Sequence, residues 1–268
     1  MTTFCTLFSG SSGNVTYLGT DRGAILIDCG MSGSQVLHAM EEAGLNPGDL
    51  SAILVTHEHS DHIKGVGVLS RKLDLPIYAT EGTWAAMENA IGSVPLHRQV
   101  TIAAGESFFL NDLEIVPFSI PHDAADPVGY RVFTPRASIA VATDLGYFAP
   151  QVEDAVSGAE IVLLESNHDP DMLRRNSHYT ETLKQRILGN HGHLSNDACA
   201  EAVVQLAESG VKQIILGHLS GENNLPALAL ETSTRRAERE GIVLGEDLNL
   251  DIALRDTVGP VYTLQEGA

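Results

Sequence analysis

Residues 55–65 read VTHEHSDHIKG and place three histidines and two acids within six positions. The apolar run 52–55 precedes them, and the helix-like stretch IKGVGVLSRKL follows. Imidazole and carboxylate groups are costly to bury unless a partner compensates them. In a tight turn after a strand, residues two apart can point the same way, so His57 and His59 can share one cation while Asp61 and His62 face a second position. Such a mixed donor set is typical of zinc, manganese or iron.

The same arrangement recurs along the chain, because six apolar runs end in an acid or a histidine. These terminal residues are Asp28, His57, His122, Asp144, Glu165 and His218. Strand ends at one rim of a sheet are where α/β proteins assemble sites from residues that are distant in sequence. The recurrence is therefore stronger evidence for a common site than any single histidine.

Short apolar runs rich in β-branched residues alternate with helical patterns. The expected strands are 3–8, 15–19, 24–28, 52–55, 76–79, 106–110, 113–118, 128–134, 138–142, 161–165, 213–217 and 250–254. The expected helices are 33–44, 62–74, 82–91, 149–157, 180–189, 196–209 and 226–240. Without a linker, a low-complexity tract or a repeat, the pattern predicts a single α/β domain over 1–268 with sheets inside and helices outside.

Composition limits the functional class. The 268 residues are 43% hydrophobic and carry a net charge of -19, which disfavours a protein that coats nucleic acid or anionic membrane with its whole surface. The three cysteines, Cys5, Cys29 and Cys199, form no CxxC spacing, so we expect buried thiols and not a disulfide framework. We identify neither a signal peptide nor an apolar run of about 20 residues. We therefore expect a cytoplasmic protein with no membrane partner.

The THEHSDH run resembles the metal motif of the metallo-β-lactamase-fold hydrolases, and Asp28, His122, Asp144 in ATDLG and His218 in GHLS follow that family's order. The resemblance implies a four-layer αββα sandwich with a dinuclear metal site on one rim. It also implies a role for each matching residue: one ion on His57, His59 and His122, the other on Asp61, His62 and His218, with Asp144 as the bridge and Asp28 orienting the ligands by hydrogen bonds.

Five further segments resemble the bacterial WalJ/YycJ-like branch of these hydrolases. They are SGSSGN at 9–14, THEHSDHIKGVGVLSRKLDLPIYAT at 56–80, ESNHD at 165–169, GHLSN at 192–196 and HLSGENN at 218–224. This branch is associated with 5′ exonuclease activity on DNA. The resemblance therefore implies two divalent ions, zinc or manganese with iron also compatible, and DNA with 5′ ends as the substrate. It leaves the oligomeric state open.

Two such ions can share a hydroxide and stabilise charge on the attacking and leaving oxygens, so no side-chain nucleophile is required. Asp61 can bind metal and also orient the hydroxide. The leaving 3′ oxygen needs a proton, for which His168 and His193 are candidates, although a structural role for each is equally open. Glu165 either fixes one of these histidines or caps a strand.

A DNA substrate also needs groups that bind phosphate or sugar. The candidates lie in two polar loops and one basic stretch: Ser11, Ser12 and Asn14; Ser220, Asn223 and Asn224; and Arg174 and Arg175, with Lys184 and Arg186 nearby. An ordinary turn, a helix-capping loop and a solvated helix face are the respective alternatives. We favour function for the first loop because it belongs to the resemblance.

The metal donors are compatible with other chemistry as well. A hydrolase of thioesters, lactones, β-lactams or small cyclic phosphodiesters would use the same donors. A non-catalytic metal sensor is a third hypothesis, but such proteins usually lose ligands, and all seven positions are filled here.

Overall fold

The structure, a computed structural model, describes residues 1–264. Residue contacts divide the chain into two compact units. Unit 1 comprises Met1–Pro117, Ala124–Ala137 and the C-terminal segment from Leu254, and unit 2 comprises Phe118–Asp123 and Ser138–Ala253. The single domain over 1–268 stays a prediction.

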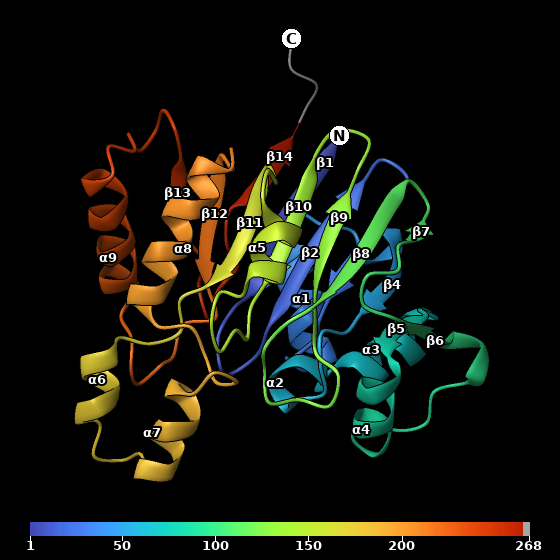
Figure 1. Ribbon diagram of the computed structural model, residues 1–268. Helices are drawn as coiled ribbons and strands as arrows, with labels where there is room; N and C mark the ends of the chain where they lie inside the picture. The colour runs from blue at the N-terminus through green and yellow to red at the C-terminus, as the bar shows by residue number, and fades with distance from the viewer. Residues whose placement is uncertain (265–268) are drawn as a thin grey trace. The chain divides into compact units, whose positions relative to one another are not determined.

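Unit 1 contains a seven-stranded sheet in the order β14-β1-β2-β3-β4-β5-β6 (Figure 1). Its strands are β1 (Thr2–Phe8), β2 (Val15–Thr20), β3 (Gly23–Ile27), β4 (Leu50–Leu54), β5 (Ile77–Thr80), β6 (Gln99–Ile102) and β14 (Val261–Leu264). Strands β3 to β6 run parallel, and the remaining pairs are antiparallel. Because β3 and β4 are parallel neighbours, the residues that follow them emerge at one rim of this sheet.

The segments between the strands of this sheet contain four α-helices: α1 (Gly33–Glu42), α2 (Ser60–Ile63), α3 (Val66–Leu73) and α4 (Glu81–Ile91). Buried side chains such as Met40 and Leu69 share one apolar cluster with Leu26 and Ile53 of the strands. Unit 1 also holds β7 (Phe108–Leu110), strand β9 (Val128–Phe133) and β8 (Leu113–Ser119) as far as Pro117, and β8 pairs antiparallel with β7. Burial of both helix and strand side chains in one cluster explains why these segments fold together.

The prediction of one helix over 62–74 is wrong, because α2 ends and α3 begins around Gly65. The Gly65 amide donates to the Cys29 carbonyl at 2.7 Å, outside the helix. A Cβ on Gly65 would lie 2.2 Å from the Met31 carbonyl oxygen, so only glycine allows this close approach. The interruption ties the metal-motif turn to the segment that follows β3.

Unit 2 contains four parallel strands, β10 (Ser138–Ala142), β11 (Ile161–Glu165), β12 (Gln213–Gly217) and β13 (Asn249–Ile252), each bonded to the next. Its helices are α5 (Pro150–Val156), α6 (Pro170–Arg175), α7 (Glu181–Leu188), α8 (Asn196–Glu208) and α9 (Pro226–Arg239). Residues Ala142 and Leu164, and Leu164 and Leu216, are register partners, so the segments after β10, β11 and β12 share one rim. The central strands β10 and β11 are buried on both faces, as expected inside a parallel sheet, whereas the last strand, β13, is partly exposed.

Two strands and one α-helix of residues 1–264 escaped sequence prediction, β6, β14 and α6, as did the short 3-10 helices at Pro47–Asp49 and Leu96–Arg98. Strands β6 and β14 have four residues each with alternating exposure, and β14 pairs with β1 at the edge of the sheet. Helix α6 has six residues and begins with Asp169 as N-cap followed by Pro170. Elements this short carry too little periodicity for a pattern to emerge.

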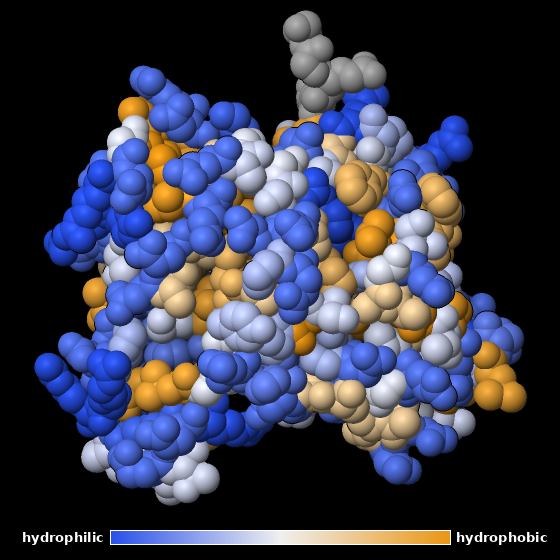
Figure 2. All heavy atoms as spheres, in the orientation of Figure 1, coloured by the Kyte–Doolittle hydropathy of each residue, from blue (hydrophilic) through white to orange (hydrophobic). Residues whose placement is uncertain are grey.

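Two expectations from composition can be compared with the structure. The three cysteines are free and buried, as predicted. No helix within residues 1–264 has both the length and the apolar character required to cross a bilayer. On the face shown in Figure 2, hydrophilic residues dominate and hydrophobic residues form small separate groups.

The apolar cluster of unit 2 yields a stability prediction. Leu206 of α8 is fully buried in this cluster, whereas Leu188 of α7 is 39% exposed. We expect Leu206→Ala to lower the free energy of unfolding by about 2–5 kcal/mol, since it leaves a cavity. The same change at Leu188 should cost less than about 1 kcal/mol. Equilibrium urea denaturation measures both, and equal losses would contradict the assigned core.

Candidate metal centre

The backbone is strained at three of the six polar strand ends that the sequence analysis identified as candidate site positions. Asp28, Asp144 and His218 have φ values of 60°, 61° and 53°, which lie in the left-handed region that non-glycine residues rarely adopt. Within residues 1–264, Asp74 and Asn111 are the other non-glycine residues with positive φ. Strain of this kind persists where the surrounding structure enforces it, and it is concentrated at functional sites.

The donors of the HxHxDH run lie together in unit 1. The ring centroids of His57 and His59 are 4.6 Å apart, and those of His57 and His62 are 4.1 Å apart. The Asp61 Oδ2 atom lies 3.6 Å from His62 Nε2. The short helix α2 begins just after His59, so the turn that precedes it carries two donors and the helix carries the other two. The structure thus brings together the four donors predicted from this run.

Buried Asp28 orients two of these histidines. Its carboxylate accepts hydrogen bonds from the Thr56 amide at 2.8 Å, the Thr56 hydroxyl at 2.8 Å and His62 Nδ1 at 2.7 Å. The Thr56 hydroxyl oxygen also lies 3.0 Å from His57 Nδ1 and can accept its proton. Each ring then has its proton on Nδ1 and the lone pair on Nε2, which is the form that binds metal. Sequence reasoning missed Thr56, although it directly precedes His57 in the motif.

Asn14 lies beside the same site in unit 1. Its side chain is 7% exposed, and its amide nitrogen lies 3.1 Å from His62 Nε2 and 3.2 Å from the Gly10 carbonyl oxygen. The Asn14 backbone amide donates to the Asp61 carbonyl at 2.8 Å. In this contact the Asn14 amide donates to the Nε2 lone pair of His62, the same lone pair that would bind a cation. This agrees with a His62 ring that carries its proton on Nδ1. Asn14 therefore holds the loop after β1 against the metal motif.

In unit 2, Glu165 organises a second group of donors. Its Oε1 accepts from His193 Nδ1 and His218 Nδ1, both at 2.8 Å, and its Oε2 accepts from the Leu145 and Leu194 amides at 2.6 and 3.1 Å. Burial alone would raise the pKa of Glu165, but its histidine partners hold that pKa well below its usual range. The carboxylate is ionised and engaged, so Glu165 does more than cap a strand.

Asp144, Glu165, His193 and His218 each offer a ligand atom within 4.8 Å of the others. Asp144 Oδ1 lies 3.3 Å from His218 Nδ1 and 3.8 Å from His122 Nε2. His122 Nδ1 donates to the Gly192 carbonyl at 3.0 Å, so its Nε2 also carries the lone pair. The buried, pre-oriented imidazole and carboxylate groups in each unit fit divalent metal binding.

The two candidate proton donors differ in environment. The His193 side chain is 23% exposed and fixed by Glu165. His168 is 1% exposed, and within residues 1–264 neither ring nitrogen has a hydrogen-bond partner. Burial lowers the pKa of His168 to about 4, so its ring is neutral near pH 7. The structure favours His193 for proton transfer, although that role stays a prediction.

The predicted substrate-binding residues fall into three environments. Ser11 and Ser12 are exposed in the loop after β1. Arg174 and Arg175 are exposed at the end of α6, where Arg174 lies 3.2 Å from Asp171. Ser220 is 8% exposed and accepts from the Asn223 amide at 3.2 Å. Substrate contact by these residues stays a prediction.

Two of the predicted substrate-binding residues, Asn223 and Asn224, take part in an internal network. The Asn224 amide donates to the Ser166 and Asn167 carbonyls at 2.8 and 3.0 Å. The Asn223 side-chain oxygen accepts from Asn176 at 2.7 Å. The Asn224 bonds tie the loop after β12 to the loop after β11, and the Asn223 bond ties it to the end of α6. Asn223 and Asn224 thereby support the strand ends that carry His218 and Glu165.

Comparison with known proteins relates this site to a family. The beta-lactamase superfamily domain matches residues 24–219, a range that includes all seven predicted metal ligands. Exodeoxyribonuclease YycJ of Bacillus anthracis is 42% identical over 243 residues, 91% of this chain and 92% of that protein. Exodeoxyribonuclease WalJ of Streptococcus pneumoniae strain D39 is 41% identical over 257 residues, 95% of each protein.

Solved structures support the fold at lower identity. Zn(2+)-bound PqqB from Methylobacterium extorquens matches with a TM-score of 0.73 at 16% identity and covers 96% of this chain and 99% of that one. The metallo-beta-lactamase fold protein YhfI from Bacillus subtilis matches with a TM-score of 0.69 at 14% identity, covering 96% and 98%. The predicted four-layer αββα fold is confirmed. The chain belongs to the metallo-β-lactamase superfamily and, within it, to the family of the YycJ and WalJ exodeoxyribonucleases.

Proposed function

We propose that this protein is a metal-dependent exodeoxyribonuclease that removes nucleotides from the 5′ ends of DNA. One structural observation carries the proposal. His62, His122 and His218 each donate a hydrogen bond from Nδ1 to an oxygen atom of the protein, so the lone pair that can bind metal is on Nε2. The names of the two relatives above supply the support for DNA as the substrate. We propose the 5′ polarity on the sequence resemblance alone.

The proposed cofactor is a pair of divalent ions, zinc or manganese, with iron compatible with the same donors. One ion would be held by His57, His59 and His122, the other by Asp61, His62 and His218, with Asp144 shared. Family membership supports this assignment, and so does the pre-orientation of the rings within each unit. When bound, such ions activate water and neutralise charge on a phosphodiester.

The side chains have separate roles in this proposal. Asp61 orients the attacking water, and His193 donates a proton to the leaving 3′ oxygen. His193 suits that role because Glu165 fixes its Nδ1 while part of the ring remains exposed. His168 is the second candidate, but its buried neutral ring is poorly placed for an exposed leaving group.

Contacts with the DNA backbone complete the proposal. Ser11 and Ser12 supply exposed hydroxyls, and Arg174 and Arg175 supply exposed guanidinium groups. Local cations of this kind allow a chain with a net charge of -19 to approach a polyanion. A cytoplasmic location also belongs to the proposal, and the three free cysteines are typical of a reducing compartment.

Histidine substitutions test the activity. We expect His59→Ala to lower digestion of a 5′-phosphorylated DNA duplex by on the order of 1,000-fold, since loss of one ligand removes several kcal/mol of transition-state stabilisation. The matched control is His38→Ala, because the His38 side chain is 81% exposed on α1. Duplexes labelled at either end, incubated with manganese, with zinc or with chelator, report both metal dependence and polarity.

Intact duplex in every metal condition would refute the proposal. Cleavage of a chromogenic β-lactam or a thioester instead, sensitive to His59→Ala, would favour another hydrolase on the same fold. Digestion from the 3′ end would overturn the polarity alone.

The Thr56 hydroxyl can be tested without DNA. We expect Thr56→Val to weaken zinc binding about 10- to 100-fold, because it removes the hydroxyl that joins Asp28 to His57. Thr56→Ser keeps the hydroxyl and should bind zinc as the parent does. Competition with a chromophoric chelator measures the affinity, and equal affinities for the valine and serine variants would show that the hydroxyl orients no ligand.

A further inference from the structure

Three loops of unit 2 bond to one another and form what we call the rim platform: residues 121–123, 144–147 and 190–193. The Gly146 amide donates to the Pro121 carbonyl at 2.8 Å, and the Asp123 amide donates to the His191 carbonyl at 3.0 Å. His122 adds its bond to the Gly192 carbonyl. The platform thus contains His122, Asp144 and His193 and has its own backbone support.

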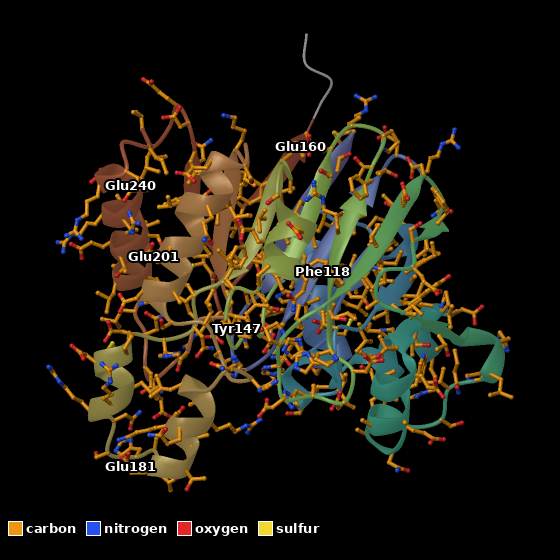
Figure 3. All side chains as sticks on the ribbon, viewed as in Figure 1. Phe118, Tyr147, Glu160, Glu181, Glu201 and Glu240 are labelled. Carbon is orange, nitrogen blue, oxygen red and sulfur yellow. The ribbon has the colours of Figure 1, made fainter. Side chains whose placement is uncertain are left out.

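Tyr147 projects from this platform. Leu145 is fully buried and Phe148 packs against the apolar cluster of unit 2, whereas Tyr147 is 44% exposed. A Cβ on Gly146 would lie 2.1 Å from the Asn190 carbonyl oxygen, so close backbone packing fixes the turn that presents the tyrosine. Figure 3 places Tyr147 at the end of the unit 2 strands nearer to α7.

An exposed phenyl or phenol ring is unusual in unit 2. Its other phenylalanine and tyrosine residues are Phe118, which is buried, and Phe148 and Tyr179, which are half-buried. Arg186 of α7 brings a cation to the platform, because it pairs with Asp123 while remaining 55% exposed. Proteins that bind single-stranded nucleic acid combine exposed aromatic rings, which stack on bases, with cations that attract phosphate.

We propose that Tyr147 stacks on a nucleobase of the DNA strand close to the phosphodiester that is cleaved. This inference rests on the proposed function. Tyr147 is three residues from Asp144, which limits their Cα separation to about 10 Å, within the span of roughly three stacked nucleotides at about 3.4 Å each. Stacking tolerates any base, as an enzyme that degrades DNA from an end requires.

A cycle of protein and substrate changes tests the stacking. We expect Tyr147→Ala to lower kcat/KM on 5′-phosphorylated DNA roughly 5- to 100-fold, and Tyr147→Phe to stay within about twofold of the parent, because stacking needs the ring and not the hydroxyl. DNA abasic at one of its first three nucleotides should slow the parent similarly and remove the difference between the parent and Tyr147→Ala. The matched control is Phe109→Ala, since Phe109 is 70% exposed on β7.

The outcomes separate this inference from the proposed function. If the parent digests DNA but Tyr147→Ala is unimpaired, or is impaired equally on intact DNA and on each abasic substrate, stacking by Tyr147 is overturned. A parent that digests no DNA overturns both proposals. Chelator competition on each variant verifies that the zinc affinity is unchanged, so that a loss of activity reflects the ring and not the metal donors.

Discussion

In each unit one buried carboxylate determines how the histidines are oriented. Asp28 takes the Nδ1 proton of His62 and positions Thr56 beside His57, and Glu165 takes the Nδ1 protons of His193 and His218. A buried carboxylate is costly unless several donors satisfy it, and each of these two accepts at least three hydrogen bonds. The same bonds that make burial tolerable orient the histidine rings so that Nε2 is the candidate ligand atom.

The parallel strands give these carboxylates their positions. Asp28 follows β3 beside β4, and Glu165 ends β11 between β10 and β12. Parallel neighbours end at one rim, so residues separated by tens of positions in sequence become neighbours in space. The left-handed backbone at Asp28, Asp144 and His218 shows that the chain is strained at the places where a strand turns into the site.

Rigidity extends beyond the donors. Asn14 and Gly65 bond the metal-motif turn to the segments after β1 and β3, and Asn224 joins the loops after β11 and β12. Such supports matter because metal ligands must be held close to their working geometry before an ion arrives. Several polar residues that look available for substrate in the sequence are therefore engaged inside the protein.

The sequence by itself determined the superfamily, most of the strands and helices, and the donor types, because HxHxDH and the polar strand ends are local patterns. It did not determine the break at Gly65, which depends on a carbonyl from another segment. It left open whether Glu165 fixes His168 or His193 or caps a strand, and it did not reveal that His218, 53 residues away, also binds Glu165. The roles of Thr56 and Asn14, and the exposure of Tyr147, were likewise decided by the tertiary structure. Hydrogen-bond partners and solvent exposure arise only when distant segments pack, so a residue's type alone does not specify them.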